Sequence, residues 1–261
     1  MSFENIKLVI KNNIATLTLN RPEKLNSFTQ AMHEEIKAAF IEIENQSVRA
    51  MVITGEGRAF CAGQDLGDRD IDAEEEFDAG DSLEQNYNPL IRKMHNAPFP
   101  IICAVNGVAA GAGANLALAC DIVVAARSAK FIQAFAKIGL IPDAGGTWSL
   151  PRKVGLARAI GLSMLAEPLS AEKACEWGLI WQVVDDDKLS QEVERMALHL
   201  AHQPTVALAN IKQALRASAS NSMSEQLDLE RDLQSASAKT DDFREGVAAF
   251  LEKRKPVFTG K

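Results

Sequence analysis

The sequence lacks the short motifs of the common metal, nucleotide and hydrolase sites. It contains no Cys-x-x-Cys pair, no His-Glu-x-x-His, no glycine loop that ends in Lys-Ser or Lys-Thr, and no Gly-x-Gly-x-x-Gly. None of its four histidines has an obvious serine partner, and Gly161 and Ser163 are not followed by the second glycine of a nucleophile elbow. The sequence therefore predicts neither a metal site nor a bound cofactor, and it leaves carboxylate chemistry supported by backbone donors.

An excess of basic residues is also missing. The 261 residues carry a net charge of -7, and the sequence pI is about 5.2, which disfavours a nucleic-acid or anionic-membrane partner. The four cysteines are widely spaced, as is typical of reduced and mostly buried side chains. The first 13 residues hold no long apolar run of the kind found in secretory signals. We therefore expect a cytoplasmic protein without nucleic-acid or membrane partners.

A long unbroken apolar segment is absent as well. Residues 96–120 carry no charge and are long enough to span a bilayer, but prolines, glycines and asparagines interrupt them. The β-branched run at 101–105 predicts a buried strand, and Gly107, Gly111 and Gly113 predict a turn from this strand into a helix. The first N–H groups of such a helix are unpaired and can bind an oxygen that carries negative charge. The alternative is that the small residues only let a helix pack closely on a sheet.

Strand and helix patterns alternate through the first part of the chain and give way to helices alone beyond Ser190. The alternation predicts an α/β architecture with mostly parallel sheets. The acidic residues 65–81 are expected to form a solvated flap rather than a calcium loop. The expected strands are residues 6–10, 14–19, 49–54, 101–105, 122–126 and 130–135, and the expected helices are residues 31–45, 191–201, 204–217, 224–238 and 241–253.

Asp143 is the best candidate for acid–base chemistry. It follows an apolar stretch and precedes Ala144-Gly145-Gly146, so its carboxylate is presented from a loop beside a helix start. Apolar surroundings disfavour the charged form whereas a helix dipole favours it, and the sequence does not decide the balance. If the first effect is appreciable, Asp143 is a competent general base near neutrality. The alternative, with equal weight, is that Asp143 caps the next helix.

Four segments together resemble one protein family. They are NRPEKLNS at residues 20–27, FCAGQDL at 60–66, AVNGVAAGAGANLALACD at 104–121 and IGLIPDAGGTWSLPR at 138–152. In this order, and with the helical end EGVAAFLEKRKPVF, they are similar to the enoyl-CoA hydratase/isomerase (crotonase) family over essentially the whole chain. GQDL, AFAKIGLIPDAGGTW and GLIWQVVDD are most similar to members that isomerise ring 1,2-epoxyphenylacetyl-CoA during phenylacetate breakdown.

The resemblance implies a particular architecture and ligand. Residues 1–190 are expected to form a spiral of repeated β-β-α units that holds the CoA and catalytic site, and residues 191–261 a helical region that builds homotrimers or homohexamers. The ligand is expected to be an acyl-CoA thioester, so that coenzyme A is part of the substrate and not a cofactor. By motif position, the backbone N–H groups of Gln64 and Ala112 form the oxyanion hole, and Asp143 is the working carboxylate of the family's isomerases.

Two departures from the family pattern bear on the reaction. Family hydratases carry glutamates at the positions of Asn115 and Phe135, so the pair that activates and delivers water is absent and hydration is not expected. Asn115 either orients the substrate or only satisfies its own hydrogen bonds, and Tyr87 either lines the acyl pocket or is an ordinary helix residue. The substrate-binding residues carried over from the family are Lys24, Ala62, Gln64, Asp65, Leu66, Tyr87, Gly111, Asn115 and Phe135, with Lys253 as a weaker candidate.

The resemblance therefore favours an intramolecular isomerase. The expected product is the ring-expanded oxepin from an epoxide of phenylacetyl-CoA, or the conjugated 2-enoyl thioester from a 3-enoyl-CoA. An enoyl-CoA hydratase and a non-catalytic acyl-CoA-binding protein are the alternatives. Uptake of water by crotonyl-CoA would identify the former, and ligand binding without turnover the latter.

Overall fold

The computed structural model describes residues 3–68 and 78–261. In these residues the larger of two sheets has six strands. Their order is β1(Ile6–Lys11), β2(Ile14–Leu19), β3(Ala50–Gly55), β5(Ile101–Val105), β7(Ile122–Ala126) and β10(Gln182–Val184). The β1–β2 hairpin turns at Asn12-Asn13 and is antiparallel, whereas all the following neighbours are parallel. The expected hairpin and the mostly parallel sheet are both confirmed.

The smaller sheet lies beyond the carboxyl ends of these strands. It is formed by β4(Ala59–Cys61), β6(Val108–Ala110), β8(Lys130–Ile132) and β9(Leu169–Ser170), in that order. Along the chain, β3, β5 and β7 of the large sheet are each followed by one strand of the small sheet, β4, β6 and β8. Helices or helical turns come next in each case, so the repeated β-β-α spiral expected from the family is confirmed.

Two local expectations were wrong because three-residue strands carry too little periodicity to be recognised. The chain does not pass from β5 directly into a helix, since β6 intervenes. Gly107 therefore connects two strands, where a Cβ atom would lie 2.2 Å from the carbonyl oxygen of Arg58. The strand expected over residues 130–135 ends at Ile132, and Phe135 lies in the 3₁₀ helix η4(Ala134–Ile138).

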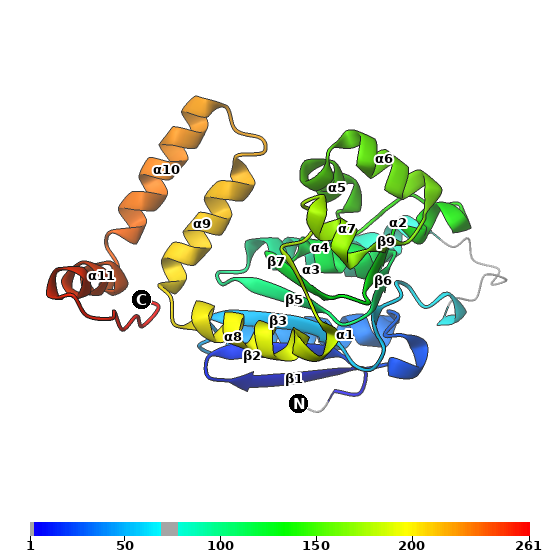
Figure 1. The fold of residues 1–261 in the computed structure, drawn as a ribbon, viewed down its shortest axis with the longest axis horizontal. Helices are drawn as coiled ribbons and strands as arrows, with labels where there is room; N and C mark the ends of the chain where they lie inside the picture. The colour runs from blue at the N-terminus through cyan, green and yellow to red at the C-terminus, as the bar shows by residue number, and fades with distance from the viewer. Residues whose placement is uncertain (1–2, 69–77) are drawn as a thin grey trace.

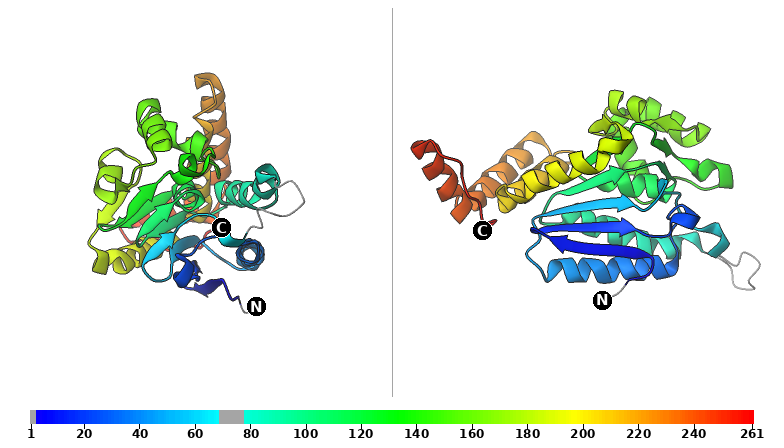
Figure 2. Two further views of the ribbon diagram at one scale, coloured as in Figure 1. Left: turned by 90° about the vertical axis from the view of Figure 1, so that its right-hand side faces the viewer. Right: turned by 60° about the horizontal axis from the view of Figure 1, so that its bottom comes forward.

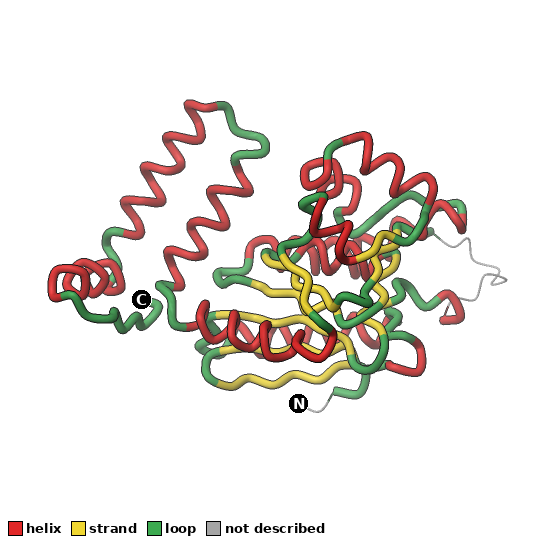
Figure 3. Tube along the Cα trace, viewed as in Figure 1, coloured by secondary structure: helices red, strands yellow, loops and turns green. Residues whose placement is uncertain are grey.

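Helices cover both faces of the six-stranded sheet. The helix α1(Gln30–Glu44) begins where the Thr29 side chain accepts a hydrogen bond from the Met32 N–H, and its buried face includes Ile36 and Phe40. Figure 2 shows α1 and α8(Leu189–Ala201) on opposite faces of this sheet, and Figure 3 shows helices surrounding the strands. The other core helices are α2(Ala79–Ser82), the π-helix η3(Leu83–Tyr87), α3(Asn88–Asn96), α4(Ala112–Ala119), α5(Gly146–Val154), α6(Leu156–Leu165) and α7(Ala171–Glu176). Residues 69–77 of the expected acidic flap lie outside the described residues.

The C-terminal helices α9(Thr205–Ala217), α10(Met223–Ser237) and α11(Asp241–Glu252) extend away from the sheets (Figure 1). By contrast α8, although it follows the boundary expected near residue 190, packs on β3, β5 and β7. Two cations attach α9 to the core: Lys212 and Arg216 both form ion pairs with Asp121, at 2.9 and 2.8 Å. The part of the chain that leaves the core thus begins with α9.

Candidate active site

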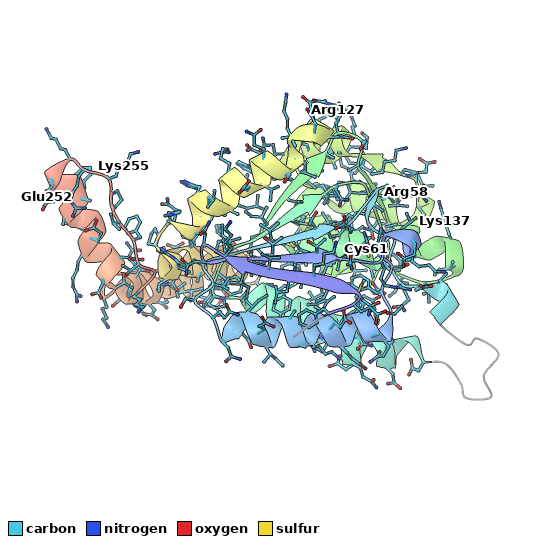
Figure 4. The ribbon with its side chains drawn as sticks, turned by 90° about the horizontal axis from the view of Figure 1, so that it is seen from below. Arg58, Cys61, Arg127, Lys137, Glu252 and Lys255 are labelled. Carbon is cyan, nitrogen blue, oxygen red and sulfur yellow. The ribbon has the colours of Figure 1, made fainter. Side chains whose placement is uncertain are left out.

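A pocket of about 450 Å³ lies beside the small sheet, where the segments after β4 and β6 meet the segment after β8. Figure 4 shows Lys137 of η4 at the end of the molecule opposite to Glu252 and Lys255, with Cys61 of β4 further inside the core. The lining residues are Ala62, Gly63, Gln64, Leu66, Leu83, Tyr87, Gly111, Ala112, Ala134, Phe135, Lys137, Ile138, Leu140, Ile141, Pro142 and Asp143. Most of these residues are apolar, and only Lys137 and Asp143 are charged.

The backbone N–H of Gln64 points away from the neighbouring Phe28 segment. Phe28 N–H donates to the Gly63 carbonyl at 2.8 Å and the Phe28 carbonyl accepts from Asp65 N–H at 2.9 Å, so Phe28 and Gln64 form an isolated parallel bridge. In such a bridge the central residue, here Gln64, directs its own N–H and carbonyl to the other side. The Gln64 side chain is also fixed, because it donates to the Phe28 carbonyl at 3.0 Å and accepts from the Tyr87 hydroxyl at 2.7 Å.

The Ala112 turn lies directly against the Gln64 turn. Ala112 is the first residue of α4, and Gly111 before it has a φ of 53°. A Cβ atom added to Gly63 would lie 3.0 Å from the Ala110 carbonyl oxygen and 3.5 Å from the Ala112 nitrogen. Among residues 3–68 and 78–261, no hydrogen bond uses the backbone N–H of Gln64 or of Ala112. Two adjacent turns therefore each bring a backbone donor to the same pocket.

Asp143 lies on a tight turn that lines the same pocket. Its carbonyl accepts hydrogen bonds from the Gly146 N–H and from the Asn115 side chain, both at 2.8 Å. The two central residues, Ala144 and Gly145, have φ values of 46° and 78°, as in a mirror-image type I turn. The N-cap of α5 is Gly145 and no side chain caps this helix, so the capping alternative for Asp143 is excluded. Its half-buried side chain lines the pocket instead.

Neutral groups lie behind the Gln64 turn. Burial, with a smaller contribution from Lys37, lowers the pKa of His33 to about 4. This imidazole stacks on Phe28 at 4.9 Å between ring centroids and meets the Tyr87 ring edge-on at 4.5 Å. Burial likewise raises the pKa of the Cys61 thiol to about 12, so Cys61 is not a thiolate nucleophile at neutral pH.

The pocket brings together most, but not all, of the residues expected from the sequence. Asp65 does not line it, because its carboxylate pairs with Arg21 at 3.0 Å and accepts from the Gly67 N–H. Asn115 does not line it either, since its amide is engaged with Asp143 and with Gln133. Lys24 is exposed in η1(Pro22–Lys24), next to the Leu25 carbonyl that accepts from Ala62 N–H. The residues that do meet in the pocket are Ala62, Gln64, Leu66, Tyr87, Gly111, Ala112, Phe135 and Asp143.

Other lining residues were missed from the sequence. Lys137, Leu140 and Ile141 follow Phe135 in the same segment as Asp143, and this continuity was the available signal. Leu83 lies on η3 after the acidic segment, and nothing local in the sequence distinguishes it. Lys253, the weaker candidate, belongs to neither the pocket nor its surroundings, because it ends α11 between Glu252 and Lys255 at the far end of the chain (Figure 4).

The described part of the chain has neither a cluster of metal ligands nor a membrane-spanning helix. No group of three or more histidine, cysteine, aspartate or glutamate side chains there is placed to hold a metal ion. No helix there has the length and apolar character needed to cross a bilayer.

The fold is that of a known class. The model of the enoyl-CoA hydratase/isomerase family matches residues 9–261, and the chain belongs to this family. It is 56% identical over 254 residues to the 1,2-epoxyphenylacetyl-CoA isomerase of Escherichia coli (strain K12), and the match covers 97% of each chain. It is 49% identical over 261 residues to a protein of Rhodobacter capsulatus named "Probable enoyl-CoA hydratase", with full coverage of both. The crystal structure of an enoyl-CoA hydratase from Bacillus anthracis matches 99% of this chain and 100% of its own, with a TM-score of 0.92 and 31% identity.

Proposed function

We propose that the protein is an acyl-CoA isomerase that converts ring 1,2-epoxyphenylacetyl-CoA to the ring-expanded oxepin thioester. The observation that carries this proposal is that two backbone-donor turns and the Asp143 carboxylate line one mostly apolar pocket. The 56% identity to an isomerase named for this substrate supports the same reaction. Isomerisation of 3-enoyl-CoA to 2-enoyl-CoA uses the same groups and is a second reaction of the site.

The proposed chemistry needs a stabilised enolate. The Asp143 carboxylate removes a proton from a carbon α or γ to the thioester, the electron pair moves onto the thioester oxygen, and the N–H groups of Gln64 and Ala112 bind that oxygen. The carboxylic acid then returns the proton to a different carbon, so that no atom is gained or lost. In the epoxide, the bond between the two epoxide carbons also breaks, and its electrons enter the double bonds of the seven-membered oxepin ring. Preorganised donors of this kind are each worth about 3–4 kcal/mol of barrier stabilisation.

Hydration is the second candidate, because the Rhodobacter capsulatus relative carries that name. The pocket does not favour it. Phe135 presents an apolar ring where family hydratases carry a glutamate, and the Asn115 amide is turned toward the Asp143 backbone. Among the described lining residues, Asp143 is the one carboxylate, which can move a proton within a substrate, and no second carboxyl group there is placed to deliver water.

Substrate-binding roles follow from the lining of the pocket. We propose that backbone atoms around Ala62, Gln64 and Leu66 hold the pantetheine end of CoA, with Lys24 near the nucleotide. Tyr87, Gly111 and Phe135 face the acyl group. Asp65 contributes by keeping Arg21 against the Ser27 carbonyl beside the Gln64 turn.

A test uses purified protein and three thioesters: epoxyphenylacetyl-CoA, a 3-enoyl-CoA and crotonyl-CoA, each in ¹⁸O-labelled water. The proposal expects products of unchanged mass from the first two and no labelled 3-hydroxy product from crotonyl-CoA. Rapid labelling of crotonyl-CoA would establish a hydratase instead. Binding of all three thioesters without any product would establish a non-catalytic acyl-CoA-binding protein.

We also propose a homotrimer or homohexamer assembled through the C-terminal helices. Phe250 and Leu251 of α11 are 83% and 73% exposed, and Leu215 of α9 is 69% exposed. Apolar side chains this exposed favour burial in an interface. Light scattering should give three or six times the 28.3 kDa of one chain, and a monomer would contradict the proposal. The expected cytoplasmic location stays a prediction.

A further inference from the structure

The Asp143 turn is held by a chain of buried amides that no requirement of the helix or sheet explains. Gln133 Nε2 donates to Asn115 Oδ1 at 2.9 Å, and Asn115 Nδ2 donates to the Asp143 carbonyl at 2.8 Å. Asn115 is 1% exposed and Gln133 is 4% exposed. The three residues come from α4, from the N-cap of η4 and from the turn before α5. The chain of amides therefore joins separate segments that border the pocket.

The direction of these hydrogen bonds is forced. A backbone carbonyl can only accept, so the NH₂ group of Asn115 must face Asp143 and its oxygen must face away. That oxygen can likewise only accept, so the NH₂ group of Gln133 must face it. The remaining Gln133 Oε1 is buried without a hydrogen-bond partner among the described residues. Leaving a buried acceptor unpaired is unfavourable. The Gln133 amide nevertheless has the orientation in which its NH₂ group donates to Asn115.

The turn that receives the last hydrogen bond is one that needs support. Ala144 is a non-glycine residue in the left-handed region, with a φ of 46° and with 3% of its surface exposed. Space for the Asn115 amide is also reserved, because a Cβ atom on Gly146 would lie 2.3 Å from Asn115 Nδ2. The sequence thus keeps both a donor for the Asp143 carbonyl and the room in which this donor must lie.

We propose that Gln133 and Asn115 are positioning residues, which hold the Asp143 turn so that its carboxylate faces the reacting carbon. This inference rests on the proposed role of Asp143 as the acid–base group. Neither amide lines the pocket, so their effect is transmitted through the Asp143 backbone. Their removal is expected to lower kcat with little change in thioester binding, because a displacement of about 1 Å at a reacting group can cost about a hundredfold in rate.

The experiment compares Gln133→Met with Gln133→Glu. Gln133→Met keeps the length of the side chain but removes the donor, and we expect kcat to fall about tenfold at every pH, in line with the loss of one buried hydrogen bond. In Gln133→Glu the introduced carboxyl donates to Asn115 only when it is protonated. Its kcat should match that of Gln133→Met at high pH and recover toward the wild-type value as the pH falls.

Two controls separate positioning from a loss of stability. Asn210→Leu removes an amide that bonds to Leu233 and Ser237 between α9 and α10, and it should lower Tm without lowering kcat. The dissociation constant for phenylacetyl-CoA should stay within about twofold of the wild-type value in both Gln133 variants.

The titratable groups that face the pocket beside this amide chain are Asp143, Lys137 and the Tyr87 hydroxyl. All three groups are present in both Gln133 variants. The pH profile of Gln133→Met therefore shows their titration alone, and any additional pH dependence in Gln133→Glu comes from the introduced carboxyl.

The outcomes are distinct. Wild-type kcat in Gln133→Met, or identical pH profiles in the two Gln133 variants, would overturn the positioning role even if Asp143→Asn is inactive. Full activity in Asp143→Asn would instead overturn the proposed function itself. If Gln133→Met does not fold, Asn115→Asp provides the same comparison, because the introduced carboxyl donates to the Asp143 carbonyl only when protonated, and its kcat should rise as the pH falls.

Discussion

The two walls of the pocket are built in different ways. On one wall the Gln64 and Ala112 turns meet backbone to backbone, with glycines at 63 and 111 and no side chain between them. On the other wall the Asp143 turn is held by side chains, through Asn115 and Gln133. The first wall offers N–H groups, which every residue except proline has, and the second offers one particular carboxylate. Substitutions should therefore act through space and backbone shape on the first wall, and through chemical identity on the second.

The largest expected effect is at the carboxylate. Asp143→Asn keeps the size of the side chain but removes the proton acceptor, and we expect turnover to fall roughly 10²–10⁴-fold. Steady-state assays with the proposed substrate measure this loss, while calorimetry with phenylacetyl-CoA and thermal unfolding should show unchanged binding and Tm. More than a tenth of wild-type activity would remove Asp143 from its role.

A smaller but still large effect is expected where the two donor turns touch. In Gly63→Ala the new Cβ atom would lie 3.0 Å from the Ala110 carbonyl oxygen and would push the turns apart. We expect a loss of roughly 10²–10³-fold in kcat, comparable with removal of one oxyanion donor. The matched control is Gly139→Ala, because Gly139 has a similarly left-handed φ of 73° but no atom of the described residues lies within 4 Å of the added Cβ. Equal kcat losses in the two variants would show that backbone strain, and not the spacing of the turns, is responsible.

The buried His33, which packs against Phe28 and Tyr87 behind the Gln64 turn, should make the free energy of unfolding depend on pH. Burial lowers the pKa of His33 from 6.5 to about 4, so the unfolded chain gains a proton in this range while the native protein does not. Stability is then complete above pH 6.5 and falls as the pH approaches 4, by up to about 3 kcal/mol. Urea unfolding of wild type and His33→Leu, each at neutral and at mildly acidic pH, measures the difference. An equal pH dependence in both proteins would contradict this assignment.

The smallest effect is expected from the Gln64 side chain. Gln64→Ala removes its hydrogen bonds to Phe28 and Tyr87 but keeps the backbone N–H, so kcat should fall by less than about tenfold. Tyr87→Phe should behave alike, and the double variant should be less than additive because both changes remove the same hydrogen bond. A loss as large as that of Asp143→Asn would show that the Gln64 side chain, rather than its backbone, does the chemistry.

The three turns that line the pocket could be predicted from the sequence. The glycine-punctuated segments around Gln64 and Ala112 and the Asp-Ala-Gly-Gly run at Asp143 carry strong local signals for turns. The family resemblance assigned their roles, and the structure places all three turns at one pocket. The β5 strand was also predicted correctly from its β-branched run, and the C-terminal helices from their long periodic segments.

The rest could not be predicted, because it depends on contacts between distant segments. Nothing near Gln133 indicates that its amide meets Asn115, 18 residues away, or that Asn115 then reaches the Asp143 carbonyl, 28 residues further along the chain. Asp65 was expected to bind substrate, and only the fold shows that Arg21 occupies its carboxylate. The three-residue strand β6 is defined by its neighbours β4 and β8 and not by its own sequence.

The most direct test of the account is a crystal structure of Asp143→Asn with phenylacetyl-CoA bound. The account predicts the thioester oxygen within about 2.7–3.1 Å of the backbone nitrogens of both Gln64 and Ala112, with the substituted side chain in van der Waals contact with the carbon that loses the proton. A thioester oxygen bound elsewhere, or a reacting carbon out of reach of residue 143, would contradict it.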